Sequence, residues 1–88
     1  MTYTINGKEW TEFDINERCA ELMAHEVVNY CRSAHYAWTI IDKCWDELMV
    51  VHLTDDYYAR WECIMSKHNC TKLVAACICY IEINEAAL

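Results

Sequence analysis

The longest run of apolar positions in this 88-residue sequence is LVAACICYIEI, over Leu73–Ile83. Glu82 is its single charged residue, and its large apolar side chains recur at helical spacing. A helix that is apolar on nearly every side is normally buried. Thr71 offers a hydroxyl that can cap the first backbone amides of such a helix. The pattern therefore predicts a central core helix over residues 71–84.

A different pattern near residue 1 predicts a β-hairpin over Thr2–Thr11. Two short β-prone runs flank Asn6-Gly7, and this dipeptide favours the tight turn in which both central residues have positive φ. A two-stranded hairpin alone is marginally stable in water. We therefore expect it to pack on the rest of the chain, through Tyr3, Ile5 and Trp10.

The stretch from Thr11 to about Ala24 predicts a first helix. Thr11 with Asp14 three residues later approximates a capping box, and Asp14 and Arg18 have the i, i+4 spacing of an ion pair. The apolar stripe of this helix consists of Ile15, Cys19, Leu22 and Met23. Whether residues 27–31 prolong the helix is left open by the pattern.

A second helix is predicted from about Ser33. Its apolar stripe consists of Ala34, Ala37, Trp38, Ile41, Trp45 and Leu48, and Asp42, Lys43, Asp46 and Glu47 lie opposite. Two tryptophans on one stripe bury a large area and favour a core position. The alternative is an exposed aromatic face used for recognition.

Residues 49–67 give the most ambiguous pattern. The β-rich run MVVHL (Met49–Leu53) is followed by a turn-like polar cluster, Thr54-Asp55-Asp56. The residues after it fit a strand near 58–65, and they also fit a helix over 56–67 with Trp61, Ile64 and Met65 on one side. We favour the strand, because the N-terminal hairpin needs a sheet to join.

These elements predict a single small globular α+β domain over residues 1–88. A small antiparallel sheet, made of the hairpin and the strand near 58–65, packs on two or three helices with the helix over 71–84 at the centre. The alternative is a mostly helical domain in which residues 56–67 form an extra helix.

The formal net charge of −7 changes the functional picture. It argues against direct binding to nucleic acid, which requires a basic face, and against an anionic membrane surface. It is compatible with binding a basic protein, and equally with solubility alone. If the charge is functional, the candidate interaction residues are Glu12, Asp14, Glu17, Glu21, Asp42, Asp46, Glu47, Asp55 and Asp56.

The seven cysteines indicate free thiols more than a disulfide scaffold. Their number is odd, the sequence opens without a signal-peptide pattern, and Cys19, Cys77 and Cys79 fall on apolar positions. Reduced cysteine behaves as a small buried hydrophobe and is typical of the cytosol.

Metal binding and catalysis both lack a complete pattern. Cys63, His68 and Cys70 are weak zinc candidates, and Cys31 with His35 would share a helix face, but the paired spacing of zinc ligands is missing. No glycine-rich loop is available, and no acid or histidine is singled out beside a nucleophile. We expect no metal, no cofactor and no enzymatic activity.

Three blocks of the sequence resemble a known family. FDINERCAEL, AWTIID and NCTKLVAACICYIEIN are similar to segments of the NinX-like proteins, small lambdoid-bacteriophage proteins of unsettled function. The sequence departs from the family pattern at Thr39, at Thr71 or Lys72, and at Val74, where the family has proline, proline and arginine. The resemblance implies a phage origin, a host-cytoplasm setting and core positions for Trp38, Ile40 and Ile41. It implies no catalytic residue.

Exclusion and resemblance together predict a non-enzymatic phage accessory protein that binds a host or phage protein. A counter-defence inhibitor of a basic nucleic-acid-handling complex, such as an anti-CRISPR protein, is one concrete form. The alternative is a small structural or zinc-stapled binding module whose acidic surface serves solubility alone. Nothing in the sequence determines the oligomeric state.

Overall fold

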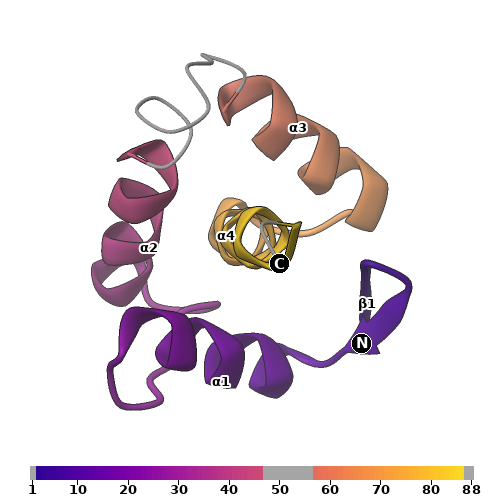
Figure 1. Ribbon diagram of the computed structural model, residues 1–88. Coiled ribbons are helices and arrows are strands. Elements are labelled where there is room, and N and C mark those ends of the chain that lie inside the picture. The colour runs from indigo at the N-terminus through magenta and orange to yellow at the C-terminus, as the bar shows by residue number, and fades with distance from the viewer. Residues whose placement is uncertain (1, 47–56, 87–88) are drawn as a thin grey trace.

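A computed structural model of the chain describes residues 2–46 and 57–86. Within these residues an antiparallel hairpin precedes four helices, and Figure 1 shows the last helix nearly end-on at the centre of the others. The elements are β1 (Tyr3–Ile5), β2 (Lys8–Trp10), α1 (Glu12–Met23), α2 (Ala34–Asp46), α3 (Tyr57–His68) and α4 (Lys72–Ala86). The predicted α+β class is confirmed, with four described helices where two or three were expected.

Helix α4 forms the core that the apolar run predicted. Every side chain from Val74 to Ile81 is buried, and the helix packs against α1, α2 and α3. Ala75 and Ala76 have no exposed area, so neighbouring helices can approach the α4 backbone closely. The predicted cap is also present, since the Val74 N–H donates to Thr71 Oγ1 at 3.3 Å.

The hairpin is confirmed in both its turn and its packing. Asn6 and Gly7 have φ values of 52° and 81°, as the Asn-Gly turn requires, and Tyr3 pairs with Trp10 across the strands. Tyr3 and Ile5 are 4% and 1% exposed, while Trp10 is half-buried. The hairpin therefore stands as a two-stranded unit that supplies one face to the core.

Helix α1 has the predicted start and end. Thr11 and Asp14 form a reciprocal capping box. The Thr11 N–H donates to Asp14 Oδ2 at 2.9 Å, and the Asp14 N–H donates to Thr11 Oγ1 at 3.1 Å. The helix ends at Met23, because Ala24 adopts a left-handed conformation with φ of 54°. Residues 24–33 are therefore a non-helical connection to α2. The expected pairing of Asp14 with Arg18 is wrong, since Arg18 pairs with Glu21 and Glu85 and Asp14 caps the helix.

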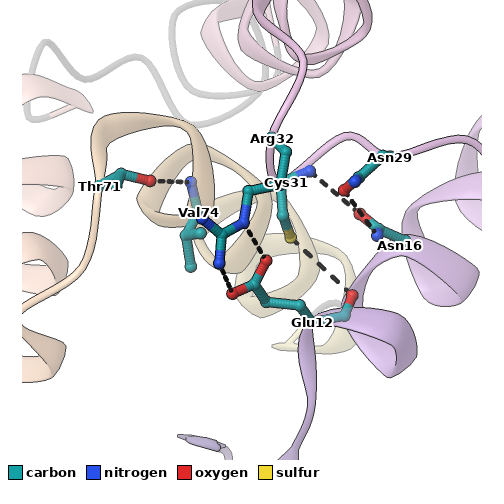
Figure 2. Close-up of polar contacts among 7 residues, drawn as sticks. All are labelled: Glu12, Asn16, Asn29, Cys31, Arg32, Thr71 and Val74. Carbon is teal, nitrogen blue, oxygen red and sulfur yellow. Dashed lines mark hydrogen bonds and ion pairs between the residues drawn. The ribbon is translucent and has the colours of Figure 1, made fainter. Parts of the chain in front are cut away.

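A buried asparagine fastens this connection to α1. Asn16 Oδ1 accepts the Cys31 N–H at 3.0 Å, and its Nδ2 donates to Asn29 Oδ1 at 3.2 Å (Figure 2). Arg32 adds a two-pronged ion pair to Glu12, with both N–O distances at 2.8 Å. These contacts add to the backbone hydrogen bonds of the connection, in which the Arg32 and Ser33 N–H groups both donate to the Asn29 carbonyl.

The predicted strand near 58–65 is wrong, because these residues belong to α3. Ile64 is buried and Trp61, Met65 and His68 are half-buried, which is the i, i+3, i+4, i+7 pattern of a helix face. Cys63 would face inward in a strand and is exposed here. The hairpin buries its inner face against helices, so it needs no third strand. The Trp61 Nε1–H also donates to the Lys72 carbonyl at 2.8 Å, linking α3 to α4.

The predicted second helix is present as α2, but the side of the helix that faces the core differs from the prediction. Ala37 and Ile40 have no exposed area, whereas Trp38 is 66% exposed and Ala34 is exposed. The core position that the resemblance implied for Trp38 is therefore wrong. Ala37 and Ile40 lie three residues apart on one side of α2, so this side faces the core and Trp38 falls outside it. The run Met49–Leu53 and its following turn lie outside the described residues, as does Leu48.

Candidate functional site

The described surface is hollowed where the hairpin meets α1 and the last turn of α4. The hollow has a volume of about 430 Å³. It is lined by Lys8, Glu9 and Trp10 of β2, by Asp14, Glu17, Arg18 and Glu21 of α1, and by Glu85 of α4. We call this site the acidic hollow, because five of its eight lining residues are carboxylates.

Three of the five carboxylates are already engaged. Arg18 donates to Glu21 and to Glu85, both at 2.7 Å, and these hydrogen bonds raise the pKa of the guanidinium. Asp14 accepts the Thr11 N–H, and this hydrogen bond is the main cause of the lowered pKa of its carboxyl group. A single arginine from the middle of α1 thus links this helix to the last turn of α4 at one edge of the hollow.

Two carboxylates remain available to a partner. Glu9 and Glu17 are exposed, and neither side-chain carboxylate makes a hydrogen bond or ion pair with another described residue. Lys8, the second cation of the hollow, lies over the ring of Trp10 with its Nζ 5.4 Å from the ring centroid. The hollow therefore presents free negative charge beside an aromatic surface that already holds an ammonium group.

Trp10 forms the aromatic wall of the hollow. Its ring packs against the core cluster, and its Nε1–H is buried without a hydrogen-bond partner among the described residues. A buried donor without a partner costs free energy in the folded chain. Indole rings also bind cations well through the ring face.

The predicted interaction residues are only partly brought together. Asp14, Glu17 and Glu21 line the acidic hollow, whereas Glu12 is bound to Arg32 on another side of α1. Asp42 is exposed on α2, away from the residues that line the hollow. Asp46 closes α2 without a described side chain, and Glu47, Asp55 and Asp56 lie outside the described residues.

Five lining residues were absent from the sequence prediction of the site: Lys8, Glu9, Trp10, Arg18 and Glu85. The sequence held a signal for Lys8, Glu9 and Trp10. A hairpin that is followed directly by a helix places its second strand beside the first turn of that helix. Glu85 had no such signal. It reaches Arg18 across 67 positions of sequence, and only the packing of α4 on α1 brings them together.

The weak zinc candidates do not form a metal centre in the described part of the chain. Cys63 is exposed, Cys70 Sγ lies 3.9 Å from the Ile64 carbonyl, and the His68 ring contacts Tyr3 edge-on at 5.8 Å between centroids. No group of three or more histidine, cysteine, aspartate or glutamate side chains is placed to hold a metal ion among residues 2–46 and 57–86.

The other pairing considered for a metal is also wrong. Cys31 lies in the connection before α2 and is buried, while His35 lies within α2 and is exposed, so the two do not share a helix face. His35 instead contacts Tyr36 edge-on, at 5.2 Å between ring centroids.

A second surface carries exposed aromatic side chains on α2. Trp38 is 66% exposed and Tyr36 is 39% exposed, and the Tyr36 ring stands edge-on to Tyr30 at 6.4 Å between centroids. Exposed aromatic side chains of this size are common at protein interfaces. Tyr36 and Trp38 are two positions apart and project from different sides of α2, so Trp38 defines the aromatic face of α2 that the sequence pattern left open.

Comparisons with known proteins add no relative: no protein family, no curated protein and no solved structure matches the chain. In residues 2–46 and 57–86, no helix combines the length and the apolar character that crossing a membrane requires.

Proposed function

We propose that this chain is a non-enzymatic binding protein whose acidic hollow receives a basic segment of a host or phage protein. The observation that carries the proposal is the hollow itself, which combines free carboxylates with an aromatic wall. The net charge of −7 adds long-range attraction for a positively charged partner and speeds its approach.

The hollow suits a lysine or arginine side chain. Such a side chain can pair with Glu9 or Glu17 and lie on the ring of Trp10 in place of Lys8. In this arrangement Lys8 is an internal competitor, because it occupies the aromatic surface and adds a repelling charge.

The biological form of the proposal follows from the resemblance to NinX-like phage proteins. We propose a phage accessory protein that acts in the host cytoplasm. An inhibitor of a basic nucleic-acid-handling complex, such as a CRISPR nuclease, is its most concrete version. The surfaces of such complexes that hold nucleic acid are basic, so an acidic protein can compete for them. A structural or housekeeping phage protein, with charge for solubility alone, is the competing class.

The test begins with capture of the partner from lysate of infected host cells and continues with the purified pair. We expect the dissociation constant to rise steeply between about 50 and 500 mM salt, as the Debye length shortens. Glu17→Gln should weaken binding by roughly tenfold, because it removes a carboxylate available to the partner. Lys8→Gln should strengthen binding several-fold.

Lys43→Gln is the matched control for Lys8→Gln. It makes the same change in net charge at an exposed position of α2 outside the hollow. Equal effects of the two variants on the dissociation constant would show that overall charge, and not the hollow, determines the affinity. An acidic partner, or a dissociation constant that does not change with salt concentration, would overturn the proposal.

The aromatic face of α2 supports one other binding mode, in which the partner buries Trp38. The observation that favours it is the 66% exposure of this side chain. Trp38→Ala separates the two modes. Loss of binding in Trp38→Ala, together with unchanged binding in Glu17→Gln, would move the interface from the hollow to α2.

A further inference from the structure

The tip of the hairpin carries two adjacent residues that can react with each other. Asn6 and Gly7 are both exposed, in the turn between β1 and β2. Figure 1 shows the hairpin at the periphery of the molecule, outside the helices. An asparagine side chain followed by glycine can close into a five-membered imide, because glycine has no side chain to hinder its own backbone nitrogen. In a folded chain the reaction also requires that both groups are free.

Both reacting groups are free at this tip. Neither the side-chain amide of Asn6 nor the N–H of Gly7 makes a hydrogen bond with another described residue. The space around Gly7 is open, since a Cβ added there would meet no heavy atom within 4 Å. The backbone nitrogen of Gly7 can therefore approach Asn6 Cγ without first losing a native contact of its own.

Hydrogen bonds protect three of the other asparagines. Asn16 is bonded through both side-chain atoms, and Asn84 Nδ2 donates to the Tyr80 carbonyl at 2.9 Å. The nitrogen that follows each of these two lies within a helix and is bonded along it. Asn29 accepts from Asn16 through Oδ1, and the N–H of the following Tyr30 donates to the Val28 carbonyl at 2.9 Å. In all three cases the reaction has to break native hydrogen bonds first.

Asn69 gives the closest comparison with Asn6. It is exposed as well, and its φ of 50° is nearly that of Asn6, at 52°. The nitrogen that would attack it belongs to Cys70, whose N–H donates to the Met65 carbonyl at 3.3 Å. Among the asparagines of the chain, all of which lie in described residues, Asn6 thus has both its side-chain amide and its following nitrogen unengaged.

We propose that Asn6-Gly7 is a site of spontaneous modification, at which the chain loses ammonia and gains a carboxylate. The Gly7 nitrogen attacks Asn6 Cγ, and the new N–Cγ bond replaces the Cγ–Nδ2 bond. Ammonia leaves with the proton of the Gly7 N–H. Water then opens the imide ring at one of its two carbonyls. Opening at Cγ gives aspartate, whereas opening at the main-chain carbonyl gives isoaspartate, in which the backbone continues through Cγ.

The closed turn slows this reaction without preventing it. Ring closure needs a rotation about the Cα–C bond of Asn6, which the pairing of Ile5 with Lys8 opposes. The two strands are three residues long each, and so short a hairpin opens readily at its tip. We therefore expect the folded chain to react at a rate several-fold below that of the unfolded chain.

The two products differ in their effect on the hairpin. Aspartate followed by glycine suits the same tight turn, so the aspartate product keeps the hairpin. Isoaspartate adds one backbone carbon to a two-residue loop, so Ile5 and Lys8 no longer face each other. Ile5 is 1% exposed, and loss of its position should lower the thermal midpoint by a few degrees. The displaced strand β2 also carries Lys8 and Trp10 of the acidic hollow, but the proposal does not rest on that site.

The experiment incubates the full chain in mildly alkaline buffer and maps its tryptic peptides by mass spectrometry. Cleavage after Lys8 releases the peptide that carries Asn6. We expect Asn6 to lose its amide on the order of tenfold faster than each of the other asparagines, which their hydrogen bonds protect. Concentrated urea should accelerate the loss at Asn6 several-fold. An isoaspartate-specific methyltransferase should label the product, and the incubated chain should have a lower thermal midpoint than Asn6→Asp, which carries the same charge without the extra backbone carbon.

Cys70→Gly is the matched control for the role of the structure. It places a glycine after Asn69, while the N–H of residue 70 keeps its bond to the Met65 carbonyl. In the folded variant Asn69 should still react much more slowly than Asn6, and in urea the two should react alike. Equal rates in the folded variant would overturn the proposal.

The unmodified chain decides the proposal even if Cys70→Gly folds poorly. An Asn6 that stays intact in the folded chain and reacts in urea would overturn it, as would faster loss of ammonia at another asparagine. A chain rich in isoaspartate whose thermal midpoint equals that of Asn6→Asp would overturn the predicted effect on the hairpin.

Discussion

Helices α1 and α4 begin in the same way but differ in what surrounds them. Each follows a threonine whose hydroxyl accepts the N–H three residues later. The side chains of α4 from residue 74 to 81 are all buried, whereas α1 buries one side and exposes Phe13 to 65% and Glu17 to solvent. Volume constrains nearly every position of α4, while charge and solvation govern the outer side of α1. Stability is therefore concentrated in α4, and the candidate binding chemistry lies on α1.

The sharpest test of this difference compares Ile78→Ala with Phe13→Ala. Ile78 has no exposed area, so its truncation removes buried apolar surface and leaves a cavity in the core. We expect a loss of about 3 kcal/mol in the free energy of unfolding. Phe13 is 65% exposed, and its truncation should change that free energy by less than about 0.5 kcal/mol.

Urea unfolding followed by far-ultraviolet circular dichroism measures both variants. The slope of the transition serves as the control, since an unchanged slope shows that the unfolded states remain comparable. Similar losses for the two variants would mean that α4 is not the principal source of stability.

A second test compares two asparagines, one on each helix. Asn16→Ala on α1 removes the acceptor of the Cys31 N–H and leaves that buried amide without a partner. We expect a loss of about 2 kcal/mol, because an unpaired buried donor costs its full desolvation. Asn84→Ala on α4 removes a local bond from Nδ2 to the Tyr80 carbonyl, at 2.9 Å, and should cost about half as much or less.

Hydrogen exchange gives a second readout of the same comparison. The amide of Cys31 should exchange much faster in Asn16→Ala, since the connection then opens more often. Asn84→Ala should leave that amide protected. Equal exchange in the two variants would show that Asn16 does not hold the connection.

The parts of the fold that could be predicted from sequence depend on residues close together in the chain. The turn at Asn6-Gly7 requires two adjacent residues, and the capping box spans Thr11 to Asp14. The apolar run of α4 carries its own burial signal on every side. In each case a local interaction determines the local structure, so its spacing was sufficient.

The parts that could not be predicted depend on which element packs against which. Residues 57–68 fit two periodicities, and only the way in which the hairpin buries its inner face excludes a third strand. The size of Trp38 favours a core position, yet α2 buries Ala37 and Ile40 and leaves the large ring 66% exposed. For the same reason the sequence could not place Glu85 in the acidic hollow, because its partner Arg18 lies on another helix. Three of the nine predicted interaction residues line that hollow.

The smallest expected effect concerns the caps of the two helices. Thr11→Ala and Thr71→Ala should each cost about 1 kcal/mol, since each removes one side-chain acceptor from a helix start. The two starts differ in their third helical residue. Asp14 closes the α1 box with its carboxylate, whereas Val74 at the equivalent position of α4 has no acceptor. The two caps should therefore respond differently to acid.

The pH dependence follows from the lowered pKa of Asp14, whose first cause is the hydrogen bond from the Thr11 N–H. A group whose folded pKa lies below its unfolded value stabilises the protein above the unfolded value, near 3.8 here, and loses that contribution as the pH falls through the folded pKa. The stability gap between the unmodified chain and Asp14→Asn should accordingly narrow between about pH 5 and pH 2. Other carboxylates titrate in both proteins, so their effects cancel in the difference. The gap between the unmodified chain and Thr71→Ala should stay constant over the same range, and a parallel change in both gaps would show that the acid sensitivity does not originate in the α1 cap.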